Sequence, residues 1–148
     1  MSAELNLERI EIEALSRRAR ELKDRGGRLV QIGATRLADG VELTYSFGLD
    51  RDLTNLRLTV TNPETPVPSI SSVFWCAFLY ENEIHDLFGL RIDGMSVDFH
   101  GKLYQTAIQF PFGATKAPAA KPDTTPKTGA EQVEPSATPR PVPVSAIL

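Results

Sequence analysis

The chain has 148 residues, with 16 Lys and Arg side chains against 19 Asp and Glu and a formal net charge of −3. That length is typical of one domain, and the acidic balance argues against a nucleic-acid-binding surface. A single cysteine, Cys76, excludes an internal disulfide and a cysteine-ligated iron–sulfur cluster held by this chain alone. Because Cys76 lies in an apolar run, it is predicted to be a small buried residue.

The N-terminal region predicts a long amphipathic helix over residues 7–25. Residues 1–4 lack the basic start and apolar core of a signal peptide. Asn6 is a plausible N-cap of the helix, and Gly26 and Gly27 end it. Apolar residues recur at intervals of three and four, at Leu7, Ile10, Ala14, Leu15, Ala19 and Leu22.

Three strands follow, over residues 29–37, 41–49 and 53–61, and the turn at residues 38–40 makes the first two a hairpin. Alternating apolar residues in the second strand predict one buried face. Pro63, Pro66 and Pro68 then predict an extended, strand-free crossing to a second helix.

The second helix is predicted over residues 72–88. Its candidate caps are three serines, Ser69, Ser71 and Ser72. Periodicity alone also allows its first half to be a buried strand. Short strands are expected at residues 90–92 and 97–99 around an Asp93-Gly94 turn, and residues 103–112 form a final strand or an irregular docking segment.

These elements predict an α+β fold, a two-layer sandwich in which a helix precedes an antiparallel three-strand meander, a buried helix and short strands. Residues 1–113 form this single domain. Seven of the 11 prolines fall in residues 114–148, which contain no aromatic residue. That segment is therefore predicted to be a disordered tail.

The second helix combines apolar and acidic residues in an unusual way. Its first eight residues after Ser72 are all hydrophobic, too few for the ~20 needed to span a bilayer. Glu81, Glu83 and Asp86 follow, where the helix dipole disfavours each acid by ~0.3–1 kcal/mol. Trp75, Tyr80 and other aromatic residues frame them. This pattern favours an interface at which the acids meet basic groups of a partner, although a solvated helix end explains any single acid.

Three other functions remain open on the residues alone. Glu81, His85, Glu83 and His100 offer metal ligands, but no HExxH motif or cysteine pair supports a catalytic zinc site. Acid–base catalysis by the helix acids would need an apolar pocket and a positioned substrate. A free-standing protein-binding module would present the same aromatic and acidic surface to a different partner.

The run Glu81-Asn82-Glu83-Ile84-His85-Asp86-Leu87-Phe88-Gly89, with Gly94 after it, resembles the signature of the 30-kDa subunit family of respiratory complex I. It is closer still to the small hydrophilic subunit of energy-converting, membrane-bound [NiFe] hydrogenases of the Ech and CO-induced type. Complex I members usually have Arg where this chain has Asn82, and His-Pro where it has Met95-Ser96. The continuation over residues 98–104 also resembles the hydrogenase branch.

The resemblance implies a structural subunit with no active site, metal or cofactor of its own. It would dock on the catalytic large subunit, beside an iron–sulfur small subunit. The complex would transfer electrons from ferredoxin to protons and couple this reaction to ion translocation. The chain would be cytoplasmic and peripheral to the membrane. A subunit of an NADH:quinone oxidoreductase-like complex is the alternative. The predicted partner interface comprises Trp75, Tyr80, Glu81, Glu83, His85, Asp86, Phe88, Gly89 and Gly94.

Overall fold

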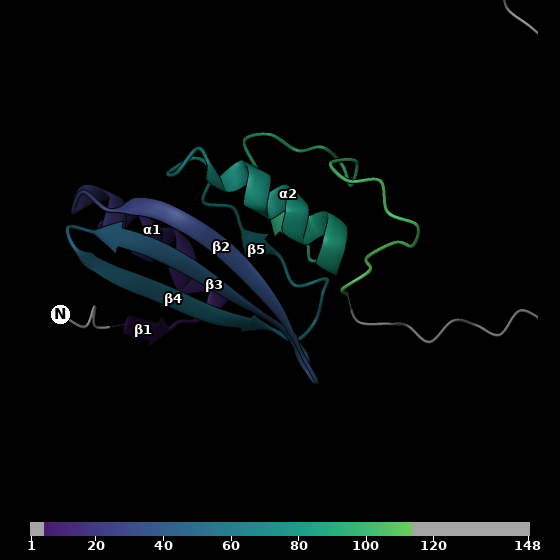
Figure 1. Ribbon diagram of the computed structural model, residues 1–148, viewed down its shortest axis with the longest axis horizontal. Coiled ribbons are helices and arrows are strands. Elements are labelled where there is room, and N and C mark those ends of the chain that lie inside the picture. Colours follow the sequence, from purple (N-terminus) through teal and green to yellow (C-terminus); the bar gives the residue numbers. More distant parts are fainter. Residues whose placement is uncertain (1–4, 114–148) are drawn as a thin grey trace, which may run out of the picture. The chain divides into compact units, whose positions relative to one another are not determined.

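A four-stranded sheet forms the centre of the computed structural model, which describes residues 5–113 (Figure 1). The strand order is β1-β4-β3-β2. Strands β2, β3 and β4 form the predicted antiparallel meander, and β1 pairs parallel with β4 at the edge. The four strands are β1 (Leu5–Arg9), β2 (Arg28–Leu37), β3 (Gly40–Leu49) and β4 (Asp52–Val60).

The N-terminal strand corrects the helix predicted over residues 7–25. Residues Leu5 to Arg9 pair with β4 from Leu53 to Arg57, so Asn6 lies within a strand and caps no helix. A 3₁₀ turn, η1 (Ile12–Ala14), leads into the shorter helix α1 (Leu15–Asp24). Apolar periodicity misplaced the helix start because it cannot detect a strand partner about 50 residues away in the sequence.

One face of the sheet carries the core. Tyr45 is paired with Ile32 on β2 and with Leu56 on β4, so the three side chains share a face. Both helices contribute to the same hydrophobic cluster. Helix α1 does so through Leu15, Ala19 and Leu22, and helix α2 (Ala77–Phe88) through Ala77 and Ile84. This arrangement confirms the predicted α+β class with one helical layer against one sheet.

The opposite face of the meander is polar. Arg57 lies 3.3 Å from Glu42 and donates a 3.2 Å hydrogen bond to Thr44. Ser46 donates a 2.7 Å hydrogen bond to Asn55 on the same face. These cross-strand contacts satisfy the polar side chains opposite the core.

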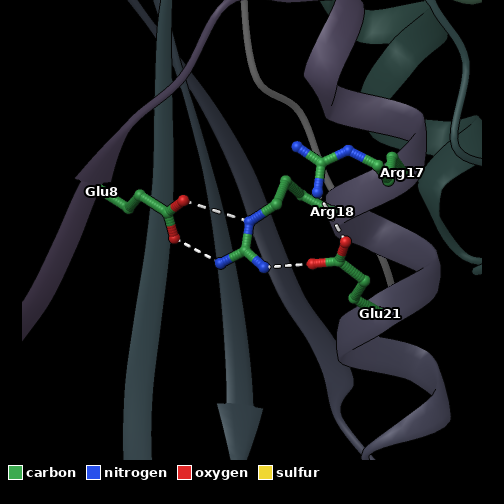
Figure 2. A network of polar contacts seen from close by, with 4 residues as sticks. All are labelled: Glu8, Arg17, Arg18 and Glu21. Atoms are coloured by element: carbon green, nitrogen blue, oxygen red, sulfur yellow. Dashed lines mark hydrogen bonds and ion pairs between the residues drawn. The ribbon is translucent and has the colours of Figure 1, made fainter.

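A network of charged side chains connects β1 to α1. In Figure 2 the guanidinium of Arg18 lies between the carboxylates of Glu8 and Glu21. Arg17 also donates to Glu21, at 2.6 Å. The fork of Arg18 matches the two oxygens of Glu8, a geometry that fixes orientation better than a single ion pair. The network therefore holds the N-terminal strand against the helix that follows it.

The crossing after β4 differs from the strand-free prediction. Strand β5 (Val67–Pro68) pairs parallel with β6 (Ile92–Asp93), and the two form a separate small sheet. Helix α2 spans Ala77–Phe88, five residues later than its predicted start at Ser72, and no serine caps it. Turns occupy residues 71–76 instead.

The segment after β6 returns along α2 (Figure 1). Within residues 94–113 no strand is formed, so the strand predicted at residues 97–99 is wrong and residues 103–112 take the irregular alternative. The N–H of Phe112 donates a 2.8 Å hydrogen bond to the carbonyl of Leu87, which fixes the end of this segment beside the end of α2. The tail predicted at residues 114–148 lies outside the described residues.

Candidate functional site

The predicted interface residues lie on α2 or in the segments just before and after it, and they divide into buried and exposed groups. Glu81 and Asp86 are buried, whereas Trp75, Glu83 and Gly94 are exposed. The remaining four are half-buried: Tyr80, His85, Phe88 and Gly89. The helix therefore presents one set of side chains to this chain and another to solvent.

Glu81 joins α2 to the crossing that precedes it. Its carboxylate accepts a 2.8 Å hydrogen bond from the backbone N–H of Ile70 and a 2.6 Å bond from the Ser69 hydroxyl. Ser71 continues the chain of hydroxyls, because it lies 2.7 Å from Ser69 and donates to Ser96 at 3.0 Å. Two of the predicted capping serines thus serve a side chain of the helix and not its backbone.

The carboxyl of Glu81 is held in a costly environment. Burial raises its pKa above the ordinary value of 4.5, and the bonds from Ser69 and Ile70 oppose that rise. Burial also raises the pKa of Tyr45, and the charge of Glu81 contributes to that shift. A buried carboxyl with a raised pKa is typical both of catalytic sites and of structural networks. Here both hydrogen bonds to the carboxylate come from the crossing, which favours a structural role.

Asn82 is a site residue that the sequence analysis noted only as a departure from the complex I pattern. Its side chain is fully buried and donates to the carbonyls of Phe78 and Val97 at 2.7 and 2.8 Å. Its oxygen accepts the N–H of Phe99 at 2.8 Å. This single amide therefore holds residues 97–99 against α2. The longer side chain of Arg, with donors only, could not reproduce these contacts.

Asp86 and Glu83 hold the next part of the returning segment. The N–H of Tyr104 donates to Oδ2 of Asp86 at 2.9 Å, and the Tyr104 hydroxyl donates to Glu83 at 3.0 Å. Between these two acids, Nδ1 of His85 lies 2.9 Å from the carbonyl of Leu90, just after the end of the helix. The acids of α2 thus position the segment that follows the helix.

The helix ends as predicted at Gly89, which has a left-handed φ of 72°. A Cβ at this position would lie 2.8 Å from the ring of Phe110, so glycine is required by both conformation and space. Gly94 also has a positive φ, 81°, but a Cβ at that position would have no atom within 4 Å. The two glycines therefore differ in how tightly they are packed.

Aromatic side chains gather on the outer side of α2. Trp75 is 63% exposed, and its ring centroid lies 5.3 Å from that of Phe78. Phe78 in turn lies 6.4 Å from Phe99, and Leu79 is 50% exposed beside them in sequence. We call Trp75, Phe78, Leu79 and Phe99 the aromatic surface. Cys76, predicted to be buried, is exposed here, because the apolar run is a turn followed by a helix that is covered on one side only.

Among residues 5–113, no three His, Cys, Asp or Glu side chains are placed to hold a metal ion together. The same part of the chain contains no helix that is long and apolar enough to cross a bilayer.

The family profile described as "Respiratory-chain NADH dehydrogenase, 30 Kd subunit" matches residues 8–105, about two thirds of the sequence. The chain belongs to this family. The match extends from β1 through the returning segment at Tyr104, so it includes all the hydrogen bonds described above for Glu81, Asn82 and Asp86. A comparison with curated proteins finds no match.

Solved structures share the fold of this 30-kDa subunit family member. One chain comes from "Structure of the membrane-bound sulfane sulfur reductase (MBS), an archaeal respiratory membrane complex"; it is 17% identical, with a TM-score of 0.64 over 75% of this chain and 69% of that one. The trypsin-resistant fragment (1-134) of Nqo5 is also 17% identical, with a TM-score of 0.54 over 62% of this chain and 80% of that fragment. At this identity the likeness concerns the fold alone.

Proposed function

We propose that this 30-kDa-type subunit is a non-redox structural component of a membrane-associated energy-converting complex of the [NiFe]-hydrogenase type. It docks on the catalytic large subunit, beside the iron–sulfur small subunit, and reaches the membrane only through partner chains. The complex would transfer electrons from ferredoxin to protons and couple this reaction to ion translocation. Family membership and the likeness to a chain of a respiratory membrane complex support an assembly role.

The observation that carries the proposal is the aromatic surface. Trp75 and Leu79 are 63% and 50% exposed, although large apolar side chains gain ~1.5–3 kcal/mol each from burial. Aromatic residues are enriched at the buried centres of protein interfaces. Exposed Glu83 lies on the same helix and adds a negative charge that suits a basic partner.

The hydrogenase branch is supported by one residue of α2 and two residues of the returning segment. Asn82 replaces the arginine usual in complex I members, and its amide holds Val97 and Phe99. Met95 and Ser96 stand where complex I members have His-Pro, and Ser96 exchanges hydrogen bonds with Ser71. A quinone-reducing complex remains the second candidate because the family contains both kinds of assembly.

The test is co-purification of the tagged full-length chain from its native cells. The wild-type chain should bring down a hydrogenase-like large subunit and an iron–sulfur subunit. The double variant Trp75→Ala/Leu79→Ala should recover these partners in amounts at least about tenfold lower than the wild type does. The reason is that two interface anchors of ~1–2 kcal/mol each are removed. Its thermal unfolding should be unchanged, since both side chains are exposed.

The matched control is Val30→Ala/Leu37→Ala, which removes two side chains that are 38% and 39% exposed on β2. This variant should retain the partners. A wild-type chain that purifies alone would contradict the assembly proposal. Partners that include quinone-reducing subunits and no hydrogenase-like large subunit would replace the hydrogenase type with the second candidate.

A further inference from the structure

A pocket of about 180 Å³ lies between the end of α2 and the returning segment. Its walls include His85 and Asp86 from the helix and Gly101, Tyr104 and Phe110 from the segment. No lysine or arginine of residues 5–113 lines it. The pocket is separate from the aromatic surface, which shares no residue with these walls.

Asp86 contributes an oxygen without a partner. The side chain is 5% exposed, and its Oδ2 accepts the N–H of Tyr104. Its Oδ1 is the one buried side-chain polar atom of residues 5–113 that has no hydrogen-bond partner. A buried acceptor left unpaired costs stability, and the cost is larger when the acceptor is charged. A donor that reaches Oδ1 would remove this cost.

His85 supplies a second acceptor site beside it. Its Nδ1 lies 2.9 Å from the carbonyl of Leu90, which can only accept, so Nδ1 carries a proton, and in the tautomer with that one proton Nε2 is an acceptor. A Cβ on Gly101 would lie 3.8 Å from Nε2 of His85 and 3.9 Å from Oδ1 of Asp86, with no other atom within 4 Å. The missing side chain of Gly101 thus leaves space that faces both acceptors.

We propose that this pocket binds a guanidinium group, which would donate hydrogen bonds to Oδ1 of Asp86 and Nε2 of His85. Two acceptors on one side of a small pocket call for a ligand with several donors and no acceptor. Guanidinium has five N–H donors in a planar fork and pairs readily with carboxylates.

Charge and shape favour guanidinium over a neutral donor. Glu83 lies next to the pocket through its bond to Tyr104, and the C-terminal end of α2 adds partial negative charge. The imidazole of His100, which also lines the pocket, lies 3.3 Å from the carboxylate of Asp98, and the exposed Lys102 does not line the pocket. The Phe110 ring, 6.2 Å from the His85 ring, offers an aromatic face on which a planar cation can stack.

Access to the buried oxygen requires movement of the turn at residues 100–101. His100 and Gly101 have φ values of 53° and 71°, and no regular element includes them. An outward shift of this turn would open Oδ1 while the bond from Tyr104 to Oδ2 remains. The amides of Gly101 and Tyr104 should therefore report binding directly.

The experiment titrates the ¹⁵N-labelled full-length chain with ethylguanidinium chloride at constant ionic strength. Saturable shifts are expected at the Gly101 and Tyr104 amides and at the His85 ring nitrogens. Tetramethylammonium chloride, a cation without hydrogen-bond donors, should leave them unchanged. The Asp86→Asn variant, which places an amide donor in the pocket, should bind ethylguanidinium at least tenfold more weakly.

Glu64→Gln is the charge-matched control, because Glu64 is exposed in the turn before β5 and its variant should bind as the wild type does. Equal shifts with both cations, or no saturable shift in the wild type, would overturn the proposal whether or not Asp86→Asn folds. Saturation by Zn²⁺ in place of ethylguanidinium would also overturn it, in favour of a metal site.

Two sources of the guanidinium are distinguished in cells. If it is an arginine side chain of a partner, Asp86→Asn should release the tagged chain from its complex and Glu64→Gln should not. If it is a free small molecule, the complex should stay intact in both variants although the isolated Asp86→Asn chain no longer binds. The titration uses the isolated chain, so its result does not depend on whether the assembly proposal is correct. Each of the two proposals can therefore be contradicted without the other.

Discussion

Three acids within one helix have three different environments. Glu81 is buried and accepts two hydrogen bonds, Asp86 is buried with one oxygen unpaired, and Glu83 is exposed. The sequence analysis assigned all three to one partner interface, and their spacing on the helix does not show which acid faces the crossing or the returning segment. The donors that decide the matter, Ile70 and Tyr104, lie more than ten residues away in sequence.

Replacing Glu81 tests its structural role. Glu81→Ala should lower the free energy of unfolding by about 2–3 kcal/mol, because the buried N–H of Ile70 loses its acceptor. Glu81→Gln should cost less than about 1 kcal/mol at neutral pH, since the amide oxygen can still accept that bond. Urea unfolding of the full-length variants measures both values. If Glu81→Ala and Glu81→Gln lower the free energy of unfolding equally, the hydrogen bond from the Ile70 N–H does not account for the stabilising effect of Glu81.

The same pair of proteins should show a defined pH dependence. Because the folded-state pKa of Glu81 is raised above 4.5, the folded protein binds this proton more tightly than the unfolded chain does. The wild type therefore loses stability from this group as the pH rises from about 4.5 through the folded-state pKa. Glu81→Gln lacks that loss, so its stability relative to the wild type should improve between pH 4.5 and 7.5. A constant difference would contradict the raised pKa.

At the scale of elements, sequence reasoning succeeded where the information is local. Alternation in β3, the hairpin turn before Gly40 and the end of α2 at Phe88 were all predicted, because each depends on neighbouring residues. Sequence reasoning failed where an element depends on contacts with residues far away in the sequence. Strand β1 exists through β4, and residues 97–99 are held by one amide of Asn82 instead of by a strand partner.

Substitutions at Gly94 and Gly89 distinguish the cost of a left-handed backbone from the cost of a steric clash. Gly94→Ala should cost ~1–2 kcal/mol, the penalty of a left-handed φ for a residue with a Cβ, because its surroundings are open. Gly89→Ala has a similar φ but must also displace the Phe110 ring, so it should cost at least about 1 kcal/mol more. Thermal or urea unfolding compares them. Equal costs would show that Phe110 moves aside freely.

For the molecule as a whole, the returning segment connects the core to the candidate sites. It supplies Phe99 to the aromatic surface and Gly101, Tyr104 and Phe110 to the pocket. Helix α2 and the turn before it supply the other residues of the aromatic surface, and α2 supplies His85 and Asp86 to the pocket. Neither the aromatic surface nor the pocket could be predicted in full from the sequence, because the returning segment has no hydrophobic periodicity from which its path could be predicted. The interface predicted from the family resemblance stays a prediction, and within it Trp75, Glu83 and Gly94 are the exposed residues.

Truncation tests how much of the chain this arrangement needs. A chain ending at Gly113 should unfold with the same midpoint and cooperativity as the full-length protein. The last contacts that hold the segment, from Phe112 to Leu87 and from Arg36 to the Gly113 carbonyl, are retained. A chain ending at Gln105 should be at least about 1 kcal/mol less stable, because it loses the ring pairs of Phe110 with His85 and of Phe112 with Phe88, worth ~0.5–1.5 kcal/mol each. If the longer truncation product were also destabilised, residues beyond Gly113 would be part of the folded unit, and the predicted domain limit at 113 would be wrong.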